Sequence, residues 1–154
     1  ASKKDLSIIA RILAKEFNSR SKEAYFDNPV DKYNIIEKKF IFQSKNNGYV
    51  MSGKSNQWNI FINTSKKIII ENPVYCRSIF LNSIDNLNDL SKLLPLNTQS
   101  MGLFVSEKRK RDVIKFFSDV GIDRFPSIGK MSLYENPWDG YLPLQQMVKW
   151  ISSN

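Results

Sequence analysis

The sequence has no histidine and only one cysteine, Cys76, among its 154 residues. A single cysteine cannot form a disulfide within the chain, which fits a reducing, cytoplasmic compartment. Without histidine, the chain cannot form a zinc site of cysteine and histidine ligands or a catalytic pair of serine or cysteine with histidine. Acid–base chemistry must therefore fall to carboxylates, lysine, tyrosine or water, or the key residues lie on another polypeptide segment.

Long apolar runs are lacking as well. No stretch approaches the roughly 20 apolar residues that a membrane helix needs, and the amino terminus carries no apolar signal-peptide segment. Methionine does not stand at position 1, and we expect the sequence to be a piece of a longer protein. Hydrophobic residues make up 42% and charged residues 25%, proportions that indicate a folded domain and not a disordered chain.

Helical spacing of apolar side chains predicts four helices, besides a short helical piece over residues 21–26 that ends before Pro29. The first covers residues 4–18, and a short second helix is capped by Asp85 or Asn86. Ser106 caps a longer third helix that Gly121 closes, and a last helix carries apolar residues between 144 and 151.

Short apolar stretches between turn residues predict seven strands. They cover residues 40–42, 48–51, 58–62 and 66–71 in the first half, and 77–82, 101–105 and 123–126 in the second. We interpret the first half as β-hairpins and the second as a βαβαβ unit with a mostly parallel sheet. The prediction is therefore one α/β unit over residues 1–154.

Three stretches of the second half carry a family resemblance. They are residues 76–87 (CRSIFLNSIDNL), residues 99–103 (QSMGL) and residues 121–140, which include GIDRF, IGKMS and PWDG. In order and spacing they resemble the carboxyl-terminal part of the long-chain acyl reductases of bacterial bioluminescence (LuxC type), distant relatives of the aldehyde dehydrogenases. The resemblance is good over residues 73–151 and loose before them.

The resemblance implies an aldehyde dehydrogenase-like catalytic domain and a reductase that uses NADPH. Such enzymes take a fatty acyl group from a thioester onto a cysteine and reduce it to a free aldehyde. They act as oligomers, in a complex with an acyl transferase and an acyl-protein synthetase. The family's nucleophilic cysteine and cofactor domain precede the segment matched here, and the chain has no Gly-x-Gly-x-x-Gly fingerprint. We therefore expect a carboxyl-terminal portion that is inactive alone, with most of the NADPH site outside it.

Two residues are candidates for a catalytic role. Cys76 lies beside Arg77, whose guanidinium favours a thiolate; the alternative is a small buried residue at the start of a strand. Glu71 precedes the same predicted strand, as the cofactor-contacting glutamate of aldehyde dehydrogenases does. The Phe-Gly-Pro that follows that glutamate is absent here, so the alternative is a solvated charge at a strand end.

Trp138 and Asp139 are candidates for substrate binding. They lie in the turn Pro-Trp-Asp-Gly at residues 137–140, which in the related fold follows the last strand of the unit near the substrate entrance. Trp138 is predicted to line an acyl channel. The alternative is a buried aromatic that anchors the turn, with Asp139 bonded to its own backbone.

A second hypothesis comes from the basic charge. The formal net charge is +8, and residues 108–111 are all basic (Lys-Arg-Lys-Arg). Both features, together with aromatics that we expect to be exposed such as Trp58, are typical of a small binding module for nucleic acid or an acidic protein. The remaining basic residues are spread along the chain and no nucleic-acid motif occurs, so a solvated helix face is the alternative. Binding that weakens steeply with salt would support the module.

Overall fold

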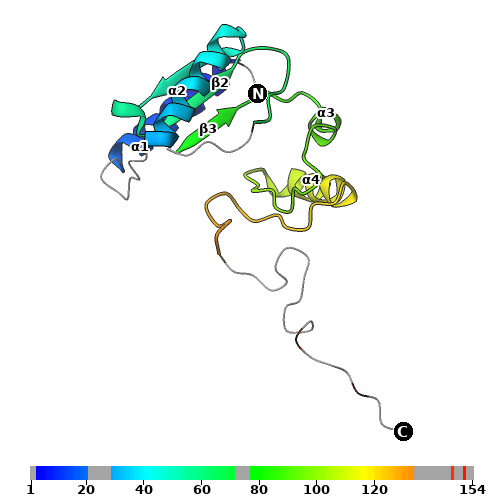
Figure 1. The fold of residues 1–154 in the computed structure, drawn as a ribbon. Helices are drawn as coiled ribbons and strands as arrows, with labels where there is room; N and C mark the ends of the chain where they lie inside the picture. Colours follow the sequence, from blue (N-terminus) through cyan, green and yellow to red (C-terminus); the bar gives the residue numbers. More distant parts are fainter. Residues whose placement is uncertain (1–2, 21–28, 72–76, 134–146, 148–150, 152–154) are drawn as a thin grey trace. The chain divides into compact units, whose positions relative to one another are not determined.

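Two helices precede a three-stranded sheet in the first part of the chain (Figure 1). The computed structural model describes residues 3–20, 29–71, 77–133, 147 and 151. It divides into two units, residues 1–92 and residues 93–154, and each is described by itself. The first unit contains α1 (Lys3–Ser19), α2 (Pro29–Ser44), β1 (Gly48–Ser52), the 3-10 helix η1 (Lys54–Asn56), β2 (Asn59–Asn63), β3 (Ser78–Leu81) and α3 (Leu87–Ser91); the second contains α4 (Glu107–Asp119).

The sheet has β2 at its centre, between β1 and β3. β1 and β2 form an antiparallel hairpin in which Gly48 lies opposite Asn63. β2 and β3 run parallel, with Asn59 opposite Ser78. Because parallel strands end at the same edge, the segments that follow β2 and β3 emerge together.

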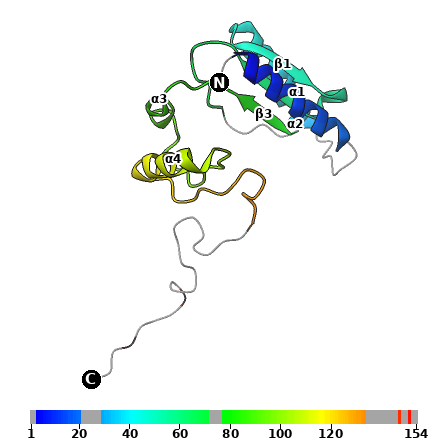
Figure 2. The same ribbon diagram turned by 180° about the vertical axis from the view of Figure 1, so that it is seen from behind.

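α1 covers one face of this sheet and α2 covers the other, as Figures 1 and 2 show from opposite sides. On α1 the buried side chains are small or apolar and recur every four residues, which places them on one face of the helix. They pack with Trp58, which precedes β2, and with alternate residues of β2 in one cluster, which comprises Leu6, Ala10, Ala14, Trp58, Ile60 and Ile62. The expectation that Trp58 is exposed is therefore wrong, since it is buried under α1 at 4% exposure. The indole Nε1 of Trp58 also donates to Asn18 Oδ1 at 3.0 Å, which fixes the end of the helix on the sheet.

Three phenylalanines form the core on the α2 side. Phe61 and Phe80, opposite each other in the parallel register, stack with ring centroids 4.3 Å apart. Phe42 of α2 meets Phe61 edge-on at 5.3 Å. Offset or edge-on aromatic pairs add about 0.5–1.5 kcal/mol to the burial of their area. Every residue of β2 is buried, as expected of a strand with a helix on each face.

The strand predicted at residues 40–42 is wrong, because these residues end α2. A strand would have sent Phe40 and Phe42 to the same face, whereas the helix separates them. Phe42 and Ile35, seven residues apart, are buried against the sheet, while Phe40 is 73% exposed. The burial of Ile35 and Phe42 on one face of the helix therefore outweighs the β-propensity of residues 40–42.

The strand predicted at residues 66–71 is also wrong. The side-chain amide of Asn82 bonds the backbone of Ile69, accepting from its N–H at 2.9 Å and donating to its carbonyl at 3.0 Å. This amide takes the place of a neighbouring strand, so no ladder forms. Between the two helices and β3, the structure describes a single hairpin, β1–β2, in place of the predicted series of hairpins.

The second unit is built around α4, whose buried face carries Val113 and Phe117. Gly121 follows with a φ of 101°, a left-handed conformation that closes the helix as predicted. The segments before and after α4 pair in parallel through isolated bridges, Ser100 with Arg124 and Leu103 with Ser127. The predicted strands at 101–105 and 123–126 therefore appear as short parallel contacts.

Among the described residues of this unit, Arg124 is a buried cation, at 6% exposure. Its guanidinium donates to the carbonyls of Met131 at 2.8 Å and Leu133 at 2.6 Å. A buried charge needs such partners, and these bonds hold residues 131–133 beside the parallel segments.

The α/β class is confirmed, as are the first helix, α4, the short helix after Asn86 and the strands β1, β2 and β3. The single βαβαβ sheet stays a prediction. The predicted helix at 144–151 lies almost wholly outside the described residues. Within those residues, no helix has the length and apolar character to cross a membrane.

We predict that Phe61→Ala destabilises the first unit by about 3–5 kcal/mol, because it removes a fully buried ring from both aromatic contacts. The measurement is hydrogen exchange of the β2 amides. Phe40→Ala is the matched control, since that ring is 73% exposed, and its effect should stay within about 0.5 kcal/mol. Equal effects of the two substitutions would contradict this packing.

Candidate functional site

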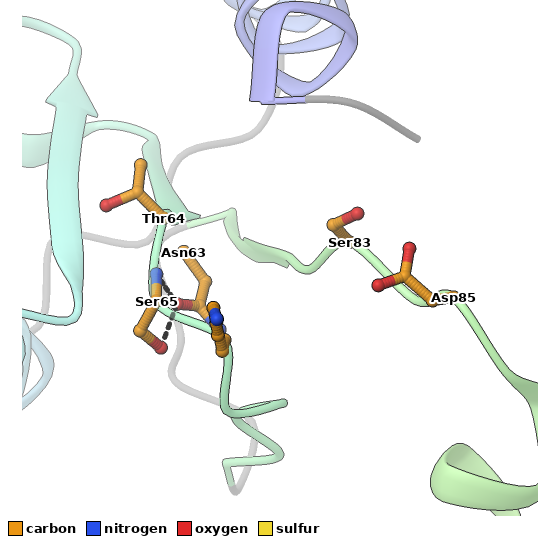
Figure 3. Close-up of a pocket in the computed structure, with 6 residues that line it drawn as sticks. Asn63, Thr64, Ser65, Ser83 and Asp85 are labelled. Carbon is orange, nitrogen blue, oxygen red and sulfur yellow. Dashed lines mark hydrogen bonds between the residues drawn. The ribbon is translucent and has the colours of Figure 1, made fainter.

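A polar pocket of about 350 Å³ lies where β2 and β3 end. Its lining residues are Asn63, Thr64, Ser65, Lys66, Ser83 and Asp85. Asn63 closes β2 and the next three residues follow it, whereas Ser83 and Asp85 follow β3. Figure 3 shows Asn63, Thr64 and Ser65 on one segment, with Ser83 and Asp85 on the other. Ligands of open α/β sheets bind at the carboxyl ends of parallel strands, so this edge is the candidate site.

Asn63 is buried at the base of the pocket, at 4% exposure, and its side-chain amide fixes the surrounding loop by hydrogen bonds. Its Oδ1 accepts from the N–H and the hydroxyl of Ser65, at 2.9 and 2.7 Å (dashed in Figure 3). Its Nδ2 donates to the carbonyl of Lys67 at 2.6 Å and to Asn82 Oδ1 at 2.8 Å. An amide has this bonding capacity and no more, so Asn63 shapes the loop and has no group left for a ligand.

Asn82 extends the same network from the end of β3. Through its two bonds to Ile69 and its bond to Asn63, it joins the segments that leave both strands. The amide pair therefore fixes the loop that presents Thr64 and Lys66.

Lys66 and Asp85 are the groups left for a ligand. Both are exposed, and among the described residues neither side chain forms a hydrogen bond or an ion pair. An ammonium donates to phosphate or carboxylate oxygens, and a carboxylate accepts from amide N–H or hydroxyl groups. The pocket can therefore hold a ligand that carries both an anionic and a hydrogen-donating group.

A family model for acyl-CoA reductase (LuxC) matches residues 6–150. The chain belongs to this family. The match confirms the resemblance in the second half and extends it across the first unit, which contains the pocket. Comparison with curated proteins gave no match, and comparison with solved structures gave none.

Glu71 is the one predicted site residue that lies among the described residues. Its Oε2 accepts from Lys38 Nζ at 2.6 Å, which joins the segment before β3 to α2. This ion pair gives Glu71 a structural partner. Cys76, Trp138 and Asp139 lie outside the described residues, so their predicted roles are carried into the proposal below.

The basic run at residues 108–111 opens α4. Lys110 Nζ lies 3.8 Å from Glu107 Oε1, and Lys108 and Arg111 line a second cavity of about 340 Å³ with Glu107. Within the described ranges, no group of three or more Cys, Asp or Glu side chains is placed to hold a metal ion.

Sequence reasoning missed the amide network, because it depends on the parallel pairing of β2 with β3. Its signal in the sequence is an asparagine at the end of each strand, Asn63 and Asn82, followed by serine and threonine.

We predict that Asn82→Ala loosens the pocket by leaving the Ile69 backbone and Asn63 Nδ2 without their partner, at a cost of about 1–3 kcal/mol. The Ile69 amide should then exchange with deuterium faster than in the wild type. Asn88→Ala, at an exposed position of α3, is the control. An unchanged Ile69 amide would count against the network.

Proposed function

We propose that this chain forms the carboxyl-terminal part of a reductase that converts long-chain fatty acyl thioesters to aldehydes with NADPH. The observation that carries the proposal is the acyl-CoA reductase family match over residues 6–150. The acyl group would be held on a cysteine outside this chain. In the proposal, an acyl transferase and an acyl-protein synthetase are partners, and the reductase acts as a cytoplasmic oligomer.

NADPH does not fit the described pocket. Its lining contains no glycine, and no glycine-rich phosphate turn occurs in the sequence. We therefore assign the cofactor mainly to the rest of the reductase, where it would supply the hydride.

The pocket suits the polar end of an acyl thioester carrier. Coenzyme A carries phosphates and amide N–H groups on the arm that ends in its thiol. Lys66 would contact a phosphate and Asp85 would accept from an amide, so the carrier would lie along the β2–β3 edge. Trp138 and Asp139 would line the path of the acyl chain. Binding the remote carrier in this way positions the thioester for reaction.

The reductase that contains this chain is expected to oxidise one NADPH for each aldehyde that it forms from a long-chain acyl-CoA. Because the nucleophile is placed outside this chain, Cys76→Ser should keep covalent acyl labelling and aldehyde formation close to the wild type. The measurements are NADPH absorbance, aldehyde yield and radiolabelled acyl-enzyme. Complete loss of labelling in Cys76→Ser would make Cys76 the nucleophile, and the absence of aldehyde from the wild type would refute the proposed activity.

Lys66→Met combined with Asp85→Asn should raise the KM for acyl-CoA about tenfold or more, since each removes a charge-assisted contact to the carrier. Its kcat should change little, because these groups lie away from the thioester carbon. The matched control is Lys67→Met, an exposed lysine that does not line the pocket. An unchanged KM in the double variant would show that the carrier binds elsewhere.

A further inference from the structure

Lys39 lies at the edge of the buried face of α2, with its amine turned toward the β1–β2 turn. Its Nζ donates to Ser52 Oγ at 2.8 Å and to Asn56 Oδ1 at 2.8 Å. The Ser52 hydroxyl donates in turn to Oδ1 of Asn59, which is fully buried. A rigid polar cluster therefore holds the amine in place.

Lys39 and its neighbour Lys38 differ in what surrounds the amine. Lys38 forms an ion pair with Glu71 at 2.6 Å. Lys39 bonds only neutral oxygens among the described residues. Burial lowers the pKa of Lys39 below its ordinary value, because desolvation disfavours the charged form. A larger share of Lys39 is therefore the neutral amine, which has a nucleophilic lone pair.

An exposed apolar stripe runs along α2 beside this lysine. Tyr33, Ile36 and Phe40 are 67%, 57% and 73% exposed and are spaced three and four residues apart, so they share one face of the helix. Ile36 precedes Lys39 by three residues and is its neighbour on the helix surface. Lys39 thus lies beside an exposed apolar stripe on the surface of α2.

We propose that Lys39 and the stripe of Tyr33, Ile36 and Phe40 form a binding site for long-chain aldehydes. The Lys39 amine condenses with the carbonyl, and the alkyl chain lies along the stripe. The inference rests on the proposed function insofar as a long-chain aldehyde is the product of that reaction. The site would hold the released product.

The condensation balances without an oxidant or a reductant. The lone pair of Lys39 Nζ attacks the aldehyde carbon, a C–N bond forms and the carbonyl electrons pass to oxygen. Proton transfer gives a carbinolamine, and loss of one water leaves an imine. Addition of water reverses the reaction and restores both the lysine and the aldehyde. Ser52 and Asn56 accept from the free amine and hold it in place until it reacts.

The test is reductive trapping on the full chain. The protein is incubated with hexanal, octanal or decanal and cyanoborohydride, which converts each imine to a stable secondary amine, and peptide mass spectrometry locates the adducts. Lys39 should be labelled several-fold more than Lys38, although both lie on the same helix. Each pair of added methylenes should raise labelling at Lys39 about threefold, because part of the added chain is removed from water.

Three variants separate binding from simple reactivity. Ile36→Asn combined with Phe40→Asn changes only exposed positions and should abolish the chain-length dependence at Lys39. Lys39→Arg keeps the positive charge and donor groups and should remove the adduct, while Lys38→Arg should not. The proposal is overturned if the labelling of each lysine follows only its solvent exposure, or if labelling at Lys39 does not change with the length of the aldehyde. Because aldehyde is added directly, this result does not depend on reductase activity, so failure here leaves the proposed function standing.

Discussion

The burial of β2 on both of its faces is the constraint on which the first unit depends. A strand covered by α1 on one side and α2 on the other must be apolar in both directions, and Ile60, Phe61 and Ile62 meet that requirement. Their burial holds two helices and two neighbouring strands in one layered body. Because β3 joins this strand in parallel, the layered body also acquires an edge at which two strand ends coincide.

The two ends of β2 are where the buried strand becomes polar. Alternation along the strand puts Asn59 and Asn63 on the same face as Phe61, toward α2. Both amides are buried and hydrogen-bonded. Asn63 orders the pocket at the β2–β3 edge, and Asn59 orders the cluster around Lys39. One apolar strand thus sets the position of both sites, which explains why neither can be understood from its surface residues alone.

The helical repeat of apolar residues in the sequence was enough to predict helices that bury a single face. The apolar repeats of α1 and of the capped helix α4 were found in this way, whereas the strands were found as short apolar stretches between turn residues. The prediction failed at Phe40, which is apolar yet exposed, and at Ile69, whose backbone is bonded by the Asn82 side chain instead of a strand. Both errors have one cause: the outcome depends on a contact with a distant residue that no local pattern records.

The candidate site, too, could be predicted only where local sequence carries the signal. Short motifs in the second half were enough to indicate the family, and the family match confirms them. The pocket itself could not be predicted, because Asn63 and Asn82 meet only after β2 and β3 pair in parallel. Glu71 was singled out by its place before a strand, and its ion pair with Lys38 became visible only with α2 in position.

The parallel pairing of β2 with β3 is accordingly the central claim, and nuclear Overhauser contacts between backbone protons test it most directly. The structure predicts contacts of Ile60 with Ile79 and of Ile62 with Leu81. Contacts of Asn59 with Leu81 and of Ile62 with Ser78 would mean that the strands run antiparallel, and the pocket at their shared end would not exist.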